Sequence, residues 1–281
     1  MKAKYLILGA GGQLGKEFVN YLQKNDMDFL APAENESDIT NPEMMQQLVQ
    51  QYQPDFVINC AAYNAVDKAE EDNNTAFLVN ATAPGTLAEI ATKKGAKLIH
   101  FSSDYVFDGS KNDLYQEHDD CKPLNVYGKS KREGEHQVLA KGDHLIFRLS
   151  WVIGPGEQNF IFKLNQWAQK NPVLRITGDE VSVPTFTFEI VRLTIASLEE
   201  NLSGIYHLTN SDYASRYELA RQYLKFAGKK NVVIPVSISH FPTPAKRPLF
   251  SAMSNHKLQQ RLKVEIPTWQ QSLEKYVKEY L

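Results

Sequence analysis

Short apolar runs alternate with segments of helical periodicity through the first half of this 281-residue chain. In one helical segment Leu14, Phe18 and Leu22 recur every fourth residue, as the buried face of a helix requires. A second helical pattern runs from Met45 to Tyr52, behind a helix start at Asn41-Pro42. The apolar runs between the helices predict five strands, at residues 5–8, 27–31, 56–60, 97–102 and 144–149. This alternation is typical of βαβ units, so we predict an α/β fold around a doubly wound parallel sheet.

A glycine-rich turn joins the first apolar run to the first helix. Gly9, Gly12 and Gly15 follow a GxxGxxG spacing. Without side chains in the way, backbone N–H groups at such a helix start can approach a pyrophosphate, which the positive end of the helix dipole also attracts. A tight turn that merely needs positive φ is the alternative for an isolated glycine trio, but the position between strand and helix favours a dinucleotide site. We therefore expect a sheet of the Rossmann type.

The regularity weakens beyond Trp151, where prolines divide the chain into shorter segments. We predict a dinucleotide-binding domain over residues 1–152, completed by part of residues 185–210. A smaller, irregular C-terminal substrate-binding lobe is expected over residues 153–281, interleaved with the first domain. A terminal helix is predicted to pack against that lobe through one face, which carries Trp269, Leu273, Tyr276 and Tyr280.

Composition argues against several classes of protein. The formal net charge is −2, so nucleic acid would find no broad basic surface. No window approaches the roughly 18 unbroken apolar residues of a membrane-spanning helix. Cys60 and Cys121 form no CxxC pair and the histidines show no metal spacing, so no metal site is predicted. Because two isolated cysteines suit a reducing compartment, we expect a cytoplasmic protein.

Tyr127 and Lys131 lie four residues apart, a spacing that places both side chains on one face of a helix. When a ketone accepts hydride, negative charge develops on its oxygen, and a phenol can donate a proton there. A neighbouring ammonium lowers the pKa of that phenol. Ser103, at the end of a predicted strand, adds a hydroxyl at the edge of the sheet that faces ligands. The spacing alone also fits a surface helix, but the ordered set of glycine turn, serine, tyrosine and lysine favours a catalytic site.

These motifs identify the chain as similar to the dTDP-4-dehydrorhamnose reductases, a family of the extended short-chain dehydrogenase/reductase superfamily. The likeness runs nearly end to end. It rests on GAGGQLG at residues 9–15, DIT at 38–40, INCAAYNAVDKAE at 58–70, SSDYVFDG at 102–109 and YGKSK at 127–131, with RLSW at 148–151, NF at 159–160, PT at 184–185 and RP at 247–248.

The resemblance implies NAD(P)H-dependent reduction of the C4 keto group of dTDP-4-dehydro-L-rhamnose to dTDP-L-rhamnose, a precursor of surface polysaccharides. Ser103, Tyr127 and Lys131 match the family's catalytic residues. Residues implied in cofactor binding are Gly9, Gly12, Gln13, Leu14, Asp38, Ile39, Ala61, Ala62 and Tyr63, together with Tyr127 and Lys131. Residues implied near the dTDP-sugar are Asp104, Tyr105, Trp151 and Arg247, the last as a partner of the diphosphate. The resemblance favours NADPH over NAD as the cofactor. A homodimer is compatible with the family. Some members hold magnesium at a subunit interface, and no residue of this sequence indicates such a site.

Departures from the family pattern also bear on the site. Serine stands at position 103, where the family usually has threonine, and both residues carry the needed hydroxyl. The family's Asp-Gln-x-Gly-x-Pro-Thr stretch appears with Glu180 and Ser182 in place of glutamine and glycine, which leaves local substrate contacts open. No charged residue ends the second strand near Ala33, so that position leaves the choice between NAD and NADP open.

Other members of the scaffold offer alternative functions. Sugar-nucleotide dehydratases carry an Asp-Glu pair where this chain has Asp104-Tyr105, so dehydration is disfavoured. Against an epimerase or another sugar-nucleotide reductase, only the family-specific motifs of this chain argue. A non-catalytic dinucleotide-binding regulator, resembling the beta subunit of methionine adenosyltransferase, is disfavoured by the presence of Ser103, Tyr127 and Lys131.

Overall fold

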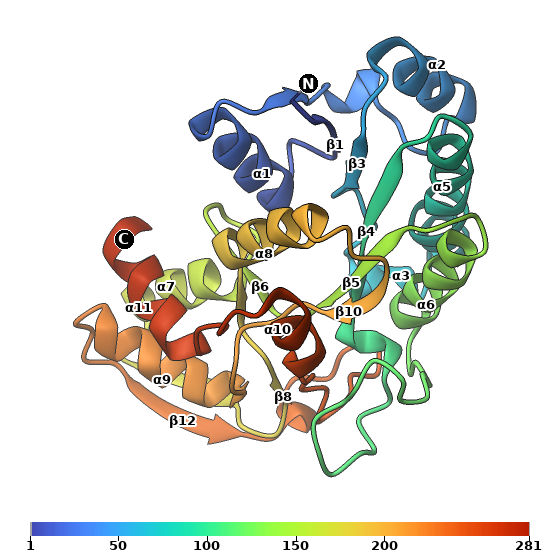
Figure 1. The fold of residues 1–281 in the computed structure, drawn as a ribbon. Coiled ribbons are helices and arrows are strands. Elements are labelled where there is room, and N and C mark those ends of the chain that lie inside the picture. The colour runs from blue at the N-terminus through green and yellow to red at the C-terminus, as the bar shows by residue number, and fades with distance from the viewer. Residues whose placement is uncertain (1, 281) are drawn as a thin grey trace.

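The computed structural model describes residues 2–280 and is built around a six-stranded parallel sheet (Figure 1). From one edge to the other, its strands are β10 (Gly204–His207), β5 (Leu145–Leu149), β4 (Lys97–Ser103), β3 (Phe56–Asn59), β1 (Lys4–Leu8) and β2 (Asp28–Leu30). Each neighbouring pair runs parallel. The doubly wound parallel sheet is confirmed, and each of the five predicted strands is confirmed to within one residue at either end. The apolar pattern does not predict β10, which lies in the less regular part of the chain.

Alternate residues of the strands face opposite layers of helices. Tyr5 and Ile7 join the core under α1 (Gln13–Lys24) and α8 (Thr187–Glu199). Leu6 and Leu8 join the core on the other face of the sheet. The helices of that face are α2 (Pro42–Tyr52), α5 (Ala83–Lys93) and α6 (Val126–Leu139). Figure 1 shows the two layers on opposite sides of the sheet. A sheet buried on both faces needs apolar residues at successive positions, which explains the continuous apolar runs.

Short helical turns connect the larger elements. The α3 (Val66–Ala69), α4 (Asn73–Phe77) and π-helical η2 (Leu78–Thr82) segments lead from β3 into α5, and the 3₁₀ turns are η1 (Glu34–Glu36), η3 (Asp104–Val106) and η4 (Ile238–His240). Within residues 2–280, no helix has the length and the apolar character to cross a lipid bilayer.

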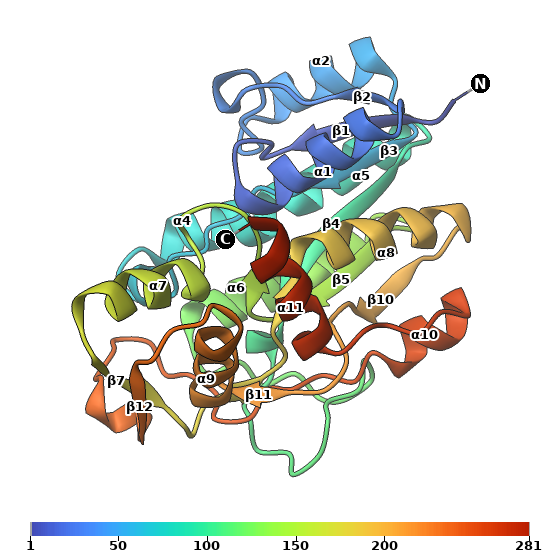
Figure 2. The ribbon, with the colours of Figure 1, turned by 90° about the vertical axis from the view of Figure 1, so that its left-hand side faces the viewer.

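A second lobe lies beside the sheet (Figure 2). Its helices are α7 (Phe160–Lys170), α9 (Arg216–Phe226) and α11 (Trp269–Tyr280). Its strand pairs are β6 (Val152–Ile153) with β9 (Thr185–Phe186), β7 (Val173–Thr177) with β12 (Val232–Val236), and β8 (Val181–Ser182) with β11 (Ala214–Ser215). Helix α10 (His256–Leu262) packs instead beside β10, and its Leu258 joins the sheet core under α1 and α8. Trp269, Leu273 and Tyr276 are buried in the lobe's core, whereas Tyr280 is 41% exposed. The chain returns to the sheet through α8 and β10 before it re-enters the lobe. The domain boundary at residue 152 stays a prediction.

Candidate active site

A cavity of about 1110 Å³ opens between the sheet and the second lobe. Its walls come from the turns after β1 and β3 and the ends of β4 and β5 on one side, and from α7, β7 and the segment before Arg247 on the other. Ligands of open parallel sheets bind at the carboxyl ends of the strands, where the strand order reverses. Here β2 and β3 flank β1 on opposite sides, so the reversal lies at the cavity. Pockets for one drug-sized ligand measure roughly 300–1,000 Å³, so this cavity is slightly larger than that range.

The glycine turn after β1 forms one end of the cavity. Gly9 has a φ of 71°, and a Cβ atom there would lie 2.6 Å from the backbone nitrogen of Ala61. Glycine therefore allows the turn after β1 to pack directly on the turn after β3. Helix α1 begins at Gln13, and its N-cap residue Gly12 makes no side-chain hydrogen bond. The N–H groups of the first turn are left open to a ligand, which fits the pyrophosphate of a dinucleotide.

The segment after β3 forms the adjoining wall. Ala61 and Ala62 line the cavity, and the buried side chain of Asn80 holds the residues behind them in place. Its oxygen accepts from the backbone N–H of Tyr63 at 2.9 Å, and its amide donates to the Tyr63 carbonyl at 3.0 Å. The same amide donates to Ser130 of α6 at 3.0 Å. The π-helical turn η2, which carries Asn80, thus fixes this wall relative to α6.

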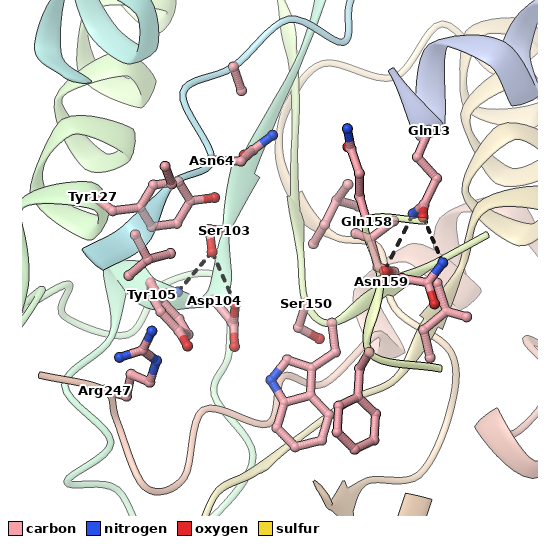
Figure 3. Close-up of a pocket in the computed structure, with 18 of the residues that line it drawn as sticks. Gln13, Asn64, Ser103, Asp104, Tyr105, Tyr127, Ser150, Gln158, Asn159 and Arg247 are labelled. Carbon is pink, nitrogen blue, oxygen red and sulfur yellow. Dashed lines mark hydrogen bonds between the residues drawn. The ribbon is translucent and has the colours of Figure 1, made fainter. Parts of the chain in front are cut away.

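Some predicted cofactor residues lie outside the cavity lining. Asp38 lines a separate hollow of the surface near η1, and Ile39 is buried in the core. Tyr63 directs its hydroxyl to Asp72 at 3.1 Å. Gln13, in contrast, lines the cavity and accepts a hydrogen bond from Asn159 at 3.0 Å, which ties the start of α1 to the start of α7 (Figure 3).

The three predicted catalytic residues meet on one wall of this cavity. Ser103 ends β4 and lies near Tyr127 of α6 (Figure 3). Lys131 also lines the cavity, one helical turn after Tyr127 on α6. Helix α6 begins beside Tyr127 because the Asn125 side chain accepts from the backbone N–H of Gly128 at 2.7 Å. The Lys131 ammonium donates to the Phe101 carbonyl at 3.1 Å and lies 5.9 Å from the centre of the Tyr127 ring.

Burial controls the protonation of this group. It raises the pKa of Tyr127, and the Ser103 hydroxyl opposes that rise. Burial also lowers the pKa of Lys131 to about 8, against the opposing charge of Glu135. Lys131 is only 2% exposed, so its ammonium acts on its neighbours with little screening by water. Such perturbed groups, gathered in a cavity, mark a candidate site for proton transfer.

Asp104 follows Ser103 and lies at the base of the cavity, 3% exposed. Its carboxylate accepts hydrogen bonds from the hydroxyls of Ser103, Ser182 and Ser251. Burial raises the pKa of Asp104, and the three hydroxyls oppose this rise. Tyr105, the next residue, lines the cavity with its ring edge-on to Tyr127, 5.9 Å between the ring centres.

Three arginines line the cavity, and two of them, Arg216 and Arg247, differ in their partners. Arg247 is held by both carboxylate oxygens of Asp67, at 3.0 and 2.7 Å. The Arg216 guanidinium stacks 3.6 Å from the centre of the Trp151 ring, and no hydrogen bond of that guanidinium is found within residues 2–280. Trp151 has a φ of 38°, and strained backbone of this kind is concentrated at functional sites. Arg216 is therefore a cation available to an anionic ligand.

Comparison with known proteins identifies the family. The family model described as the RmlD substrate binding domain matches residues 3–281. The chain belongs to the RmlD family. Among curated RmlD relatives, the spore coat polysaccharide biosynthesis protein SpsK of Bacillus subtilis is 33% identical, over 98% of this chain and 97% of its own length. A dTDP-4-dehydrorhamnose reductase of Aggregatibacter actinomycetemcomitans is 35% identical, over 96% of this chain and 97% of its own.

Solved structures resemble this RmlD chain over its full length. The dTDP-4-dehydrorhamnose reductase of Bacillus anthracis, in complex with NADP, has a TM-score of 0.96 at 32% identity and covers 99% of this chain and 100% of its own. A UDP-glucose 4-epimerase of Thermus thermophilus has a TM-score of 0.81 at 19% identity, over 98% of both chains, and shares the fold alone.

Sequence reasoning missed Arg216 and Ser251 in this RmlD chain's cavity region, and it named Ser182 only as a departure from the family pattern, without its contact to Asp104. A capping box formed by Ser215 and Glu218 marks the start of α9 in the sequence, and Arg216 follows the cap. That signal locates the helix but does not tell which cavity its first residue faces.

Proposed function

We propose that this chain is a dTDP-4-dehydrorhamnose reductase, which uses NADPH to reduce the C4 keto group of dTDP-4-dehydro-L-rhamnose to dTDP-L-rhamnose. The observation that carries the proposal is the meeting of Ser103, Tyr127 and Lys131 in a cavity that extends to the open start of α1. Relatives named for this activity match over nearly their whole length, which supports the substrate. The Bacillus anthracis complex with NADP supports the choice of cofactor.

The catalytic residues have separate roles in this proposal. NADPH, when bound, supplies the hydride that reduces C4. Tyr127 donates its phenolic proton to the C4 oxygen as negative charge develops there. The Lys131 ammonium stabilises the phenolate that results, and the Ser103 hydroxyl donates a hydrogen bond to the same oxygen.

The rest of the cavity divides between the cofactor and the substrate. Gly12, Gln13 and Leu14 at the start of α1 would hold the pyrophosphate of NADPH, beside the wall formed by Ala61 and Ala62. The lobe side would hold the dTDP-sugar.

Cations at the lobe side favour an anionic substrate. Burial lowers the pKa of Arg216, and the positive charge of Arg247 lowers it further, so the two guanidinium groups repel each other. A diphosphate between them would relieve that repulsion. Arg216 is the stronger candidate, because Asp67 already neutralises Arg247. Trp151 and Tyr105 would contact the sugar from the walls on either side.

A turnover assay tests the proposal. Purified protein, NADPH and enzymatically prepared keto sugar should show loss of NADPH absorbance together with formation of dTDP-L-rhamnose. A non-catalytic regulator would bind NADPH without consuming it, and an epimerase would convert the sugar without net loss of cofactor. Either result would reject reductase activity.

Location and assembly complete the proposal. Both cysteines, Cys60 and Cys121, are free thiols, which suits a cytoplasmic enzyme. A homodimer is proposed from the family resemblance, and light scattering after size exclusion would measure the mass directly. Fractionation of cells that express the native protein would test its location.

A further inference from the structure

The carboxylate of Asp104 is held by three serine hydroxyls, one from the preceding residue and two from distant parts of the chain. Ser103 donates to Oδ1 at 3.0 Å, while Ser182 and Ser251 donate to Oδ2 at 2.9 and 2.6 Å. Asp104, Ser182 and Ser251 are 3%, 1% and 2% exposed. These hydroxyls therefore replace water as the donors that a buried carboxylate needs.

The hydrogen bond between Ser103 and Asp104 limits what Ser103 can do. A serine hydroxyl carries one proton, and Ser103 directs it to Asp104 while its oxygen accepts from the Tyr105 backbone N–H at 3.2 Å. Before this hydroxyl can donate to a ketone, its proton has to turn away from Asp104. The carboxylate then keeps Ser182 and Ser251 as its donors, both on the other oxygen.

We propose that Asp104 is a positioning residue, and that Ser182 and Ser251 hold its carboxylate so that the Ser103 hydroxyl can turn to the ketone oxygen. This inference rests on the proposed reductase function. Both donors belong to the second lobe, where Ser182 lies on β8 and the neighbouring Val181 pairs with Phe250 in an isolated bridge. The lobe thereby acts on the catalytic serine through Asp104. Ser182 stands where the family pattern has glycine, so its hydroxyl is a feature of this chain.

The serine hydroxyls that hold Asp104, and the charged groups around it, also set the pKa of its carboxyl group. Burial raises the pKa of Asp104, while the Ser251, Ser182 and Ser103 hydroxyls and the positive charge of Arg216 on α9 lower it. Burial raises the pKa of Tyr105, its neighbour on η3, and of Tyr127 on the facing helix α6, and the negative charge of Asp104 raises both further. Loss of the lobe's hydroxyls should therefore raise the pKa of Asp104 further.

The test compares serine substitutions in two backgrounds. Ser182→Ala and Ser251→Ala should each lower kcat about tenfold, and both together about a hundredfold, because Asp104 would retain the Ser103 proton. The Michaelis constant for NADPH should not change. In a Ser103→Ala background the same substitutions should change kcat by less than about twofold, because no serine proton remains to be released. Equal losses in both backgrounds would show a merely structural role and overturn the inference.

A second readout does not depend on turnover. Carboxyl carbon NMR of ¹³C-labelled aspartate should show the Asp104 titration at higher pH in the Ser182→Ala, Ser251→Ala double variant than in the wild type. An unmoved titration would contradict the inference. Ser197→Ala serves as a matched control, since Ser197 is a buried serine that donates to the Leu193 carbonyl on α8, away from the site. If the wild type fails to turn over the keto sugar, the proposed function fails, and the NMR titration still tests how the serines hold Asp104.

Discussion

At the scale of single residues, burial gives Tyr127 and Lys131 complementary properties. Burial keeps the pKa of the Tyr127 phenol above its ordinary value, so the phenol carries its proton at neutral pH. The Lys131 pKa, lowered to about 8, leaves the ammonium mostly charged at the same pH. A protonated acid beside a cation suits proton donation to a developing oxyanion.

Replacement of Tyr127 tests the proton donor. Tyr127→Phe should lower kcat by on the order of 10² or more, the usual contribution of a general acid, while the Kd for NADPH changes little. Steady-state kinetics and fluorescence titration of NADPH measure the two effects. Tyr213→Phe is the control, because Tyr213 is 48% exposed and lies outside the cavity lining. Undiminished turnover in Tyr127→Phe would exclude this residue as the donor.

The lowered pKa of Lys131 predicts a pH dependence. A base with a pKa of about 8 is charged below that pH and neutral above it, so kcat/KM should fall as pH rises through about 8. The pKa of Tyr127 is raised, so loss of the phenol's proton does not account for that fall. Lys131→Arg should move the fall to higher pH, since arginine stays charged.

Lys129→Arg, an exposed change on the same helix, should leave the pH profile as it is. A wild-type profile without any decline between neutral and strongly alkaline pH would refute the assignment to Lys131.

At the scale of elements, the contact between α6 and η3 positions the tyrosine. A Cβ atom on Gly128 would collide with the Tyr105 carbonyl oxygen and lie 3.0 Å from Cβ of Pro123. Gly128 is therefore the place where α6 approaches the backbone that follows β4. This close approach brings Tyr127 beside Ser103.

Gly128→Ala tests that contact. The added methyl should push α6 away, reduce stability by about 1–3 kcal/mol, and lower kcat by roughly tenfold or more through misplacement of Tyr127. Thermal unfolding and steady-state kinetics measure the two effects. Lys129→Ala, an exposed change at the next position, should have little effect on either. Wild-type kcat in Gly128→Ala would mean that the phenol does not depend on this contact.

At the scale of the whole molecule, several polar contacts join the two lobes around the cavity. One is the bidentate pair between Asp67, on α3 beside the sheet, and Arg247 of the second lobe. The Asp67 carboxylate also accepts from the Ala245 backbone N–H at 3.2 Å. The pair thus holds a segment of the lobe against the cavity rim.

Asp67→Asn should loosen this segment. The KM for the sugar nucleotide should rise about tenfold, because one partner of a charged pair is lost. The kcat should stay nearly unchanged, because the catalytic wall is intact. Glu274→Gln, which breaks the exposed pair with Lys278 on α11, is the control for removal of a surface ion pair. An unchanged KM would show that this link does not shape the substrate site.

Local patterns in the sequence determined the strands, the glycine turn and the face shared by Tyr127 and Lys131. Each depends on the spacing of residues close together in the chain, where the periods of helix and strand apply directly. The family motifs added the chemistry expected at that face.

Only the tertiary structure decided which distant residues surround that chemistry. Ser182 and Ser251 bind Asp104 from positions 78 and 147 residues away. Asp67 pairs with Arg247 across 180 residues, and β10 joins the sheet beside β5. No local period relates such positions, because their approach depends on the path of the loops and on the packing of one lobe against the other. Each such polar contact depends on one residue at each end, so it produces no periodic pattern in the sequence.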